Sequence, residues 1–152
     1  MTRIVSSVPI RRSPDEVFDF VSTPANWVQW HPSTVRVTGD AAQPQTVGET
    51  CVEEFVVAGR RGEATWTVTH CERPKLWRIE TRPNAGGVGS VMYELAASAD
   101  GTAFTRTLEY TMPNPFLAVL NALVLRPRVV RESETAVQNL RRVLEEVPQL
   151  VG

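Results

Sequence analysis

The feature that constrains this chain most is its C-terminal stretch, residues 114–147, which has the pattern of a long amphipathic helix. Asn114 can cap a helix, Pro115 suits the first helical position, and Pro148 ends the segment. Apolar residues recur at spacings of three and four and form one stripe: Val130, Val137, Leu140, Leu144 and Val147. A helix of roughly 20 residues is about 30 Å long. So long a stripe needs a large apolar surface, and we expect the rest of the chain to supply it as a sheet.

Pro127 interrupts the pattern. A proline disfavours helical geometry at the preceding residue, Arg126, and removes a hydrogen bond to the preceding turn. We therefore expect a kink or break at this point. Residues 115 to about 125 would then form a lid, and residues 128–147 would form the helix that packs on the sheet.

The preceding residues read as one strand, two short helices and a series of strands. Residues 4–10 alternate as a strand does. Residues 13–16 contain a serine cap, a proline and a capping-box glutamate that start a helix through Val21. Thr23-Pro24 starts a second short helix that ends at Pro32. Strands follow at about 34–39, 48–58, 63–71, 76–82, 90–98 and 102–112, and their short connections predict an antiparallel meander.

Tight turns at Arg73-Pro74 and Asp100-Gly101 predict which residues oppose one another, for example Leu95 and Arg106. Opposed residues share a face in an antiparallel ladder. The hairpins agree on one inner face: Trp66, Val68, His70, Trp77, Ile79, Val91, Tyr93, Leu95, Phe104, Arg106, Leu108 and Tyr110. The other face is rich in Thr, Arg and Glu. Either Glu53 or Glu54 also points inward, and the sequence leaves open which one.

Several segments resemble the SRPBCC (START-like) superfamily: Ser13–Val21, Trp27–Pro32, Gly48 at a strand start, and Asp100-Gly101-Thr102. Within it, the chain is similar to the polyketide cyclase/dehydrase and lipid-transport group over nearly its whole length. The resemblance implies an α+β helix-grip fold in a single domain, 1–152. In that fold a curved antiparallel sheet of about seven strands wraps on a long C-terminal helix, and two short helices follow the first strand. It also implies a deep apolar cavity for a small lipophilic molecule.

Composition excludes some classes of function. The net charge of −1 lacks the basic excess of a nucleic-acid-binding domain. The longest apolar run, residues 117–125, is too short for stable membrane insertion. The N-terminus shows no signal-peptide pattern, so we expect a cytoplasmic protein with reduced cysteines. The two cysteines and two histidines match no metal-site spacing, and we expect neither metal nor cofactor.

Polar residues on the inner face are the candidates for chemistry. Arg106 cannot lose its charge, so it needs an anionic or accepting partner. That partner is either a ligand group or a glutamate in a salt bridge, with the arginine stem packed beneath the helix. His70 is either an acid–base group or a residue at a strand end. These two residues are the catalytic candidates, whereas His31 is interpreted as structural or exposed. The predicted ligand contacts are Trp66, Trp77, Tyr93, Arg106, Tyr110 and Leu140.

Three functions remain open. The first is binding or transport of a small hydrophobic ligand between sheet and helix, where the small Ser133 and Ala136 leave room. The alternative is a polyketide cyclase/dehydrase-like enzyme acting on a poly-ketone or aromatic substrate, with His70 or the inward glutamate moving a proton. The third is a protein-interaction module, with a partner surface formed by residues 116–125 and the arginines at 126–131. The glycines at 86–89 are interpreted as a hairpin tip over the cavity mouth.

Overall fold

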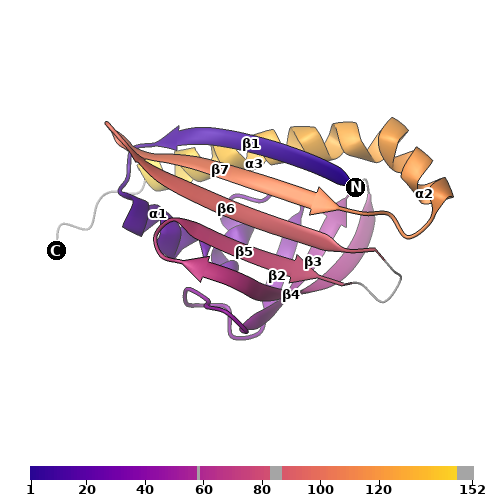
Figure 1. The fold of residues 1–152 in the computed structure, drawn as a ribbon, viewed down its shortest axis with the longest axis horizontal. Helices are drawn as coiled ribbons and strands as arrows, with labels where there is room; N and C mark the ends of the chain where they lie inside the picture. The colour runs from indigo at the N-terminus through magenta and orange to yellow at the C-terminus, as the bar shows by residue number, and fades with distance from the viewer. Residues whose placement is uncertain (58, 83–86, 147–152) are drawn as a thin grey trace.

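The computed structural model describes residues 1–57, 59–82 and 87–146. It confirms the α+β helix-grip fold: a curved antiparallel sheet of seven strands, in the order β1-β7-β6-β5-β4-β3-β2, curls around a long C-terminal helix (Figure 1). The strands are β1 (Thr2–Ile10), β2 (Thr34–Thr38), β3 (Thr50–Val57), β4 (Arg60–Glu72), β5 (Leu76–Thr81), β6 (Gly89–Ser98) and β7 (Gly101–Tyr110). The helices are α1 (Pro14–Val21), η1 (Pro24–Gln29), α2 (Pro115–Leu120), η2 (Asn121–Leu125) and α3 (Arg126–Glu146).

The two short helices after β1 form as predicted. Ser13 caps α1 by accepting the Glu16 N–H on its hydroxyl oxygen at 3.3 Å, and the hydroxyl donates to the Glu16 carboxylate at 3.1 Å. The second element, η1, is a 3₁₀ helix, and it brings Trp27 and Trp30 into the core. η1 packs against β2 and α3, and α1 packs against β6 and β7.

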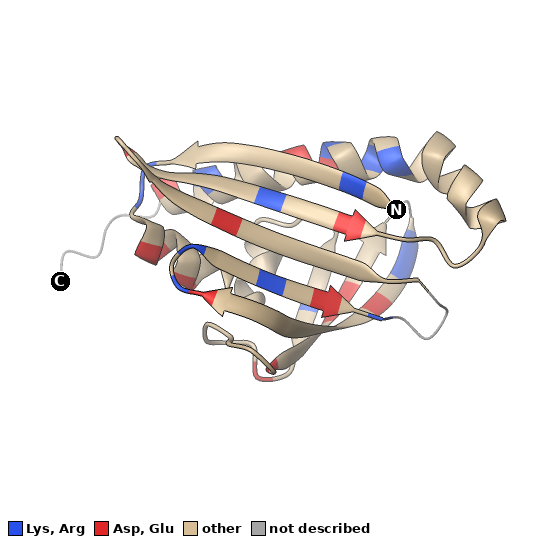
Figure 2. Ribbon diagram, in the orientation of Figure 1, with Lys and Arg blue, Asp and Glu red and all other residues tan. Residues whose placement is uncertain are grey.

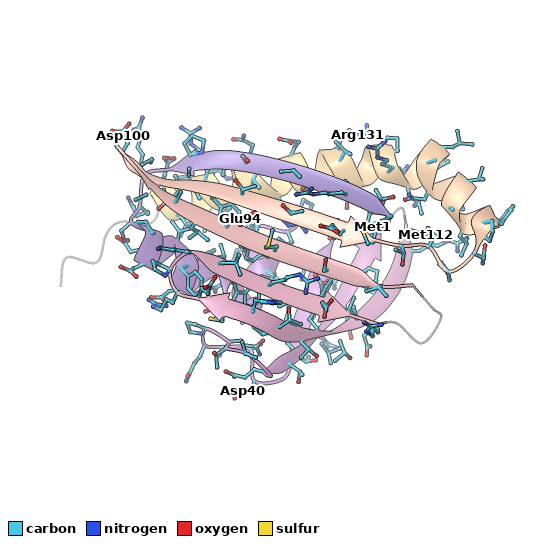
Figure 3. The ribbon with its side chains drawn as sticks, viewed as in Figure 1. Met1, Asp40, Glu94, Asp100, Met112 and Arg131 are labelled. Carbon is cyan, nitrogen blue, oxygen red and sulfur yellow. The ribbon has the colours of Figure 1, made fainter. Side chains whose placement is uncertain are left out.

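Apart from His70, the inner face of the sheet is the predicted one, although the pairing differs. Tyr93 lies opposite Trp77 on β5 and Arg106 on β7, whereas the sequence placed Ile79 and Leu108 opposite it. Both pairings are displaced by two residues. Because side chains alternate with a period of two, a displacement by two keeps every side chain on its face. The outer face stays polar and wet, and Figure 3 labels exposed Glu94 there.

The predicted inward orientation of His70 is wrong. Val68 pairs with Ile79, but His70 pairs with Arg78, because β4 carries an irregularity between Val68 and His70. A bulge of this kind adds a residue to one strand and reverses the alternation beyond it. His70 is therefore exposed on the outer side, where its Nδ1 lies 3.1 Å from the Thr69 hydroxyl.

The inward glutamate is Glu53. Val57 pairs with Arg60 across the β3–β4 hairpin, and this register puts Glu53 opposite Ala64. Glu53 is 8% exposed. Glu54 points to the outside and accepts a hydrogen bond from Arg36 at 2.6 Å.

The C-terminal helix departs from the prediction at Pro127. Arg126 keeps helical dihedral angles, φ −56° and ψ −47°, so of the expected kink or break the break is wrong, while a bend is present (Figure 1). The irregularity lies one turn earlier, where η2 is a π-helical turn and the Arg126 N–H bonds to the Asn121 carbonyl. Figure 1 shows the helical chain bending between α3 and α2. Both a π-turn and a proline are known causes of such a bend.

The stripe of α3 that faces the sheet consists of Ser133, Ala136, Val137, Leu140 and Leu144, all of them buried. Val130, predicted on this stripe, is 38% exposed. The predicted helix end at Val147 and Pro148 lies outside the described residues, as does Gly86 of the predicted hairpin tip.

The core is densest where α3 meets η1, and it is built from aromatic rings. Tyr93 stacks on Trp77 with ring centres 5.5 Å apart, and it contacts Trp30 and Phe104 at 5.6 and 5.3 Å. Asn139 of α3 donates to the Trp30 carbonyl at 3.3 Å and ties the two helices together. This cluster fills the space beside the cavity described below with close-packed rings.

Leu140 reports on this packing because its side chain is fully buried. We predict that Leu140→Ala lowers the free energy of unfolding by about 2–5 kcal/mol, since the neighbouring rings cannot close the void. Val130→Ala, on the exposed side of the same helix, should cost no more than about 0.5 kcal/mol. Urea denaturation of both variants measures the difference. Equal losses would contradict the assignment of the buried stripe.

Candidate functional site

A cavity of about 440 Å³ lies between the inner face of the sheet and the C-terminal helices, beside the aromatic cluster. Four of the predicted ligand contacts line it: Trp66, Tyr93, Arg106 and Tyr110. Trp77 and Leu140 are instead fully buried in the core, and the structure does not bring them to the cavity. Ser133 and Ala136 line it from α3, so the small residues of the stripe do leave room.

Among the described residues that line this cavity, Arg106 is the only arginine. It lies on β7 between Ser6 of β1 and Tyr93 of β6. Its Nη1 donates to the Ser133 hydroxyl at 3.0 Å, and that hydroxyl is 2.7 Å from the Ser6 hydroxyl. Its Nε is buried without a hydrogen-bond partner. In the described part of the chain Arg106 forms no ion pair, so the alternative of a glutamate salt bridge is not realised.

Glu53 is held at the cavity wall by two donors. The Thr34 hydroxyl donates to Oε2 at 2.5 Å, and the Trp66 indole N–H donates to Oε1 at 3.1 Å. Burial raises the pKa of Glu53 above its ordinary value, while the two hydrogen bonds and the positive charge of Arg106 oppose the rise. The Glu53 carboxylate is therefore protonated more readily than the carboxylate of an exposed glutamate.

His31 lies in the cavity wall and is buried, so of the two interpretations, structural or exposed, the exposed one is wrong. Its ring stacks against Trp27, with centres 5.6 Å apart, and meets the edge of Trp30 at 3.9 Å. Burial lowers its pKa well below the ordinary value, and the nearby charge of Arg106 lowers it further. The ring is therefore neutral at neutral pH.

The hydrogen bonds of His31 connect Tyr93 to Glu53. The Nδ1 atom lies 3.4 Å from the Thr34 hydroxyl oxygen, and Nε2 lies 3.3 Å from the Tyr93 hydroxyl. Thr34 has a single hydroxyl proton, which it gives to Glu53, so its oxygen accepts from Nδ1–H. A neutral imidazole then has Nε2 free to accept from Tyr93. The four groups form one directed chain in which each hydroxyl or ring donates toward the carboxylate.

Two other polar groups near the cavity have structural partners. The Tyr110 hydroxyl donates to the Asn121 side-chain oxygen at 2.6 Å, and the Asn121 amide donates to the Thr2 hydroxyl at 3.0 Å. These bonds tie η2 to the edge of the sheet.

Burial, with Glu53 nearby, raises the pKa of Cys51 to about 12, so this cysteine is a thiol at neutral pH and a poor nucleophile.

Sequence reasoning missed His31 and Thr34 as site residues. His31 follows two tryptophans in the sequence Trp27-Val28-Gln29-Trp30-His31, and this aromatic setting was the available signal of a buried ring. Its alignment with Tyr93, 62 residues further along the chain, needs the folded sheet. His70, the histidine favoured from the sequence, is on the opposite side of the sheet from the cavity.

Other kinds of site find no support among residues 1–57, 59–82 and 87–146. No group of three or more His, Cys, Asp or Glu side chains is placed to hold a metal ion. No helix in these ranges combines the length and the apolar character needed to cross a bilayer.

The sheet, the gripped helix and the cavity define a helix-grip protein of the SRPBCC type. The chain belongs to the polyketide cyclase / dehydrase and lipid transport family, whose model matches residues 1–145. Among curated proteins, none matches the chain closely enough to count as a relative.

Solved bacterial structures share the fold at low sequence identity. A Thermus thermophilus protein (TTHA0849) is 12% identical, with a TM-score of 0.76 over 95% of this chain and 97% of its own. A Chromobacterium violaceum protein (CV1439) is 14% identical, with a TM-score of 0.69 over 95% and 99%. A Bacillus halodurans protein (BH1534) is 19% identical, with a TM-score of 0.67 over 95% and 97%. At such identities these similarities establish the fold alone.

The buried neutral imidazole of His31 makes a pH-dependent contribution to stability. It stabilises the folded state fully above the unfolded-state pKa of about 6.5, and this contribution is lost as the pH falls toward the lowered pKa of the folded state. We predict that the free energy of unfolding falls more steeply below pH 6.5 in the wild type than in His31→Gln, by up to about 1.4 kcal/mol per pH unit.

Urea denaturation of both proteins at several pH values between about 5 and 7.5 measures this slope. Glu53, whose pKa is raised, contributes with the opposite sign but is present in both proteins, so the difference isolates His31. Parallel pH profiles would show that His31 is not buried in its neutral form.

Proposed function

We propose that the chain binds a small, largely apolar molecule that carries one anionic or hydrogen-bond-accepting group. The observation that carries this proposal is the buried, unpartnered Nε of Arg106 in the wall of a 440 Å³ cavity. Ligand cavities of about 300–1,000 Å³ usually combine an apolar lining with a few polar groups that orient the ligand. The family's link to lipid transport supports a hydrophobic ligand. The cytoplasmic location expected from the sequence remains part of the proposal.

Arg106 would select the polar group of the ligand. A guanidinium with a free donor in a partly buried site gains most from a carboxylate or another strong acceptor. The apolar body of the ligand would contact Trp66, Val91 and Leu108 on the sheet side. Tyr110 is occupied by Asn121 and would contribute mainly its ring.

A matched panel of ligands tests the role of Arg106. We predict that the wild type binds medium-chain and aromatic carboxylic acids more tightly than the corresponding alcohols. In Arg106→Gln the affinity for the acids should fall roughly tenfold to a hundredfold, because a charged hydrogen bond is lost, while the alcohols change little. Isothermal titration calorimetry gives the affinities, and mass spectrometry of solvent extracts identifies any co-purified ligand.

Arg78→Gln is the matched control, because Arg78 lies on the outer face and pairs with Glu80 at 3.1 Å. This variant should bind the acids as the wild type does. Equal affinity for acids and alcohols, or an equal loss in both variants, would contradict an anchoring role for Arg106. No binding or thermal shift with any member of the panel would contradict ligand binding itself.

A second candidate function, cyclase/dehydrase-like enzymology, is favoured by the directed chain from Tyr93 to Glu53. Arg106 could stabilise the negative oxygen of an enolate formed from a ketone. The chain could then carry a proton between the cavity and the Glu53 carboxylate through Thr34, His31 and Tyr93. This route replaces the predicted role of His70, which faces away from the cavity.

Proton exchange at the carbon between two carbonyl groups provides the assay for this candidate. We predict that the wild type accelerates deuterium incorporation from D₂O into an aryl 1,3-diketone, followed by NMR, and that Tyr93→Phe slows it by about 10²–10⁴-fold. His70→Gln is the control and should exchange at the wild-type rate. A wild type no faster than buffer would eliminate the enzymatic candidate and leave ligand binding standing.

A further inference from the structure

The segment formed by α2 and η2 exposes apolar side chains to the outside. Five of them form what we call the apolar outer face: Phe116, Val119, Leu120, Leu123 and Val124. Phe116 is 78% exposed and Leu123 is 74% exposed. Exposed apolar residues occur singly on most proteins, but five on two successive short elements mark an interaction surface.

The opposite side of the same segment forms part of the cavity wall. Asn121 and Leu125 line the cavity, followed by Val129 on α3. Asn121 is held there by its bonds to Tyr110 and Thr2. One helical layer therefore separates the cavity from the apolar outer face.

Positive charge flanks the apolar outer face. The sequence contains no Asp or Glu between Glu109 and Glu132, whereas Arg126, Arg128 and Arg131 follow the apolar residues directly and are exposed. Figure 2 shows α2 and η2 without charged residues and the arginines on the adjoining turns of α3, and Figure 3 labels Arg131 there. A surface hollow that includes Arg126 also includes Arg3 of β1, but Arg3 pairs with Glu109 at 3.9 Å, so the positive charge of this surface comes from the arginines of α3.

We propose that α2, η2 and the first turns of α3 dock this protein onto the surface of an anionic lipid bilayer. The apolar outer face would enter the boundary between head groups and acyl chains, and the arginines would contact lipid phosphates. The inference goes beyond the proposed ligand binding and does not depend on it. The docking is peripheral, because the segment is too short to cross a bilayer.

The positive charge of the surface favours an anionic bilayer over a second copy of the chain as its partner. A two-fold symmetric dimer places the same patch against itself, so the arginines at 126, 128 and 131 would approach their own counterparts. Like charges brought together at an interface oppose association. An anionic bilayer complements both halves of the surface, the apolar residues and the cations.

The test is co-sedimentation with phosphatidylcholine vesicles that contain or lack phosphatidylglycerol. The wild type should partition onto the anionic vesicles, and added salt should weaken the binding because it screens the arginines. The double variant Phe116→Ser/Leu123→Ser should partition at least tenfold less well. Arg126→Gln/Arg131→Gln should lose roughly fivefold for each arginine at low salt.

Two matched controls separate the surface from general effects. Val47→Ser removes an apolar side chain that is 58% exposed in the loop before β3, and Arg60→Gln/Arg61→Gln removes two exposed arginines from β4. Both should bind vesicles as the wild type does. Thermal unfolding of each variant checks that it is folded.

Failure of the wild type to partition onto anionic vesicles would overturn the proposal, and so would equal partitioning by Phe116→Ser/Leu123→Ser. A dimer seen by light scattering that this double variant dissolves, without vesicle binding, would assign the surface to a second copy instead. Titration of carboxylic acids in vesicle-free buffer should give wild-type affinity in the double variant. Loss of vesicle binding and loss of ligand binding are therefore separate results.

Discussion

The rest of the structure depends on one geometric mismatch, a single helix against a broad curved sheet. Seven strands span roughly 30 Å across the sheet, whereas a helix with its side chains is about 10–12 Å wide. α3 alone cannot fill the inner face. At one end the aromatic cluster around Tyr93 fills the remaining space, and at the other end the space stays open as the cavity. Residue size along α3 follows the same division, with Ser133 and Ala136 at the cavity and Val137 and Leu140 in the core.

The charge of Arg106 organises the polar groups in the open half. A cation in a partly buried site is costly unless acceptors surround it, and the Ser133 and Tyr93 hydroxyls supply such acceptors. The charge favours the neutral form of His31 and the ionised form of Glu53. A neutral imidazole can accept from Tyr93 and donate toward Glu53, which a doubly protonated ring cannot do. The directed chain of hydrogen bonds is thus partly a consequence of the arginine beside it.

The sequence predicted which face of the sheet each side chain lies on better than it predicted which residues oppose one another across neighbouring strands. Alternation along each strand survives a displacement by two, so Tyr93 and Arg106 were placed inward despite the wrong partners. The single bulge in β4 was invisible in the alternation, and it alone sent His70 outward. The choice between Glu53 and Glu54 depended on the number of residues in one turn. His31 could not be assigned because its partner Tyr93 on β6 lies 62 residues further along the chain, although its other partner, Thr34, is only three residues away.

The π-helical turn η2 affects both sides of the helical segment that leads into α3, the side toward the cavity and the side toward the outside. Leu117, Asn121, Leu125, Val129 and Ser133 are the less exposed positions, and they recur every fourth residue. In a regular α-helix each step of four overshoots a full turn by about 40°, so such a stripe would drift around the axis. The wider π-turn of η2, next to Pro127, reduces that drift and keeps the stripe toward the cavity. The apolar residues between these positions are then left outside, which is why the wall of the cavity also has an apolar outer surface.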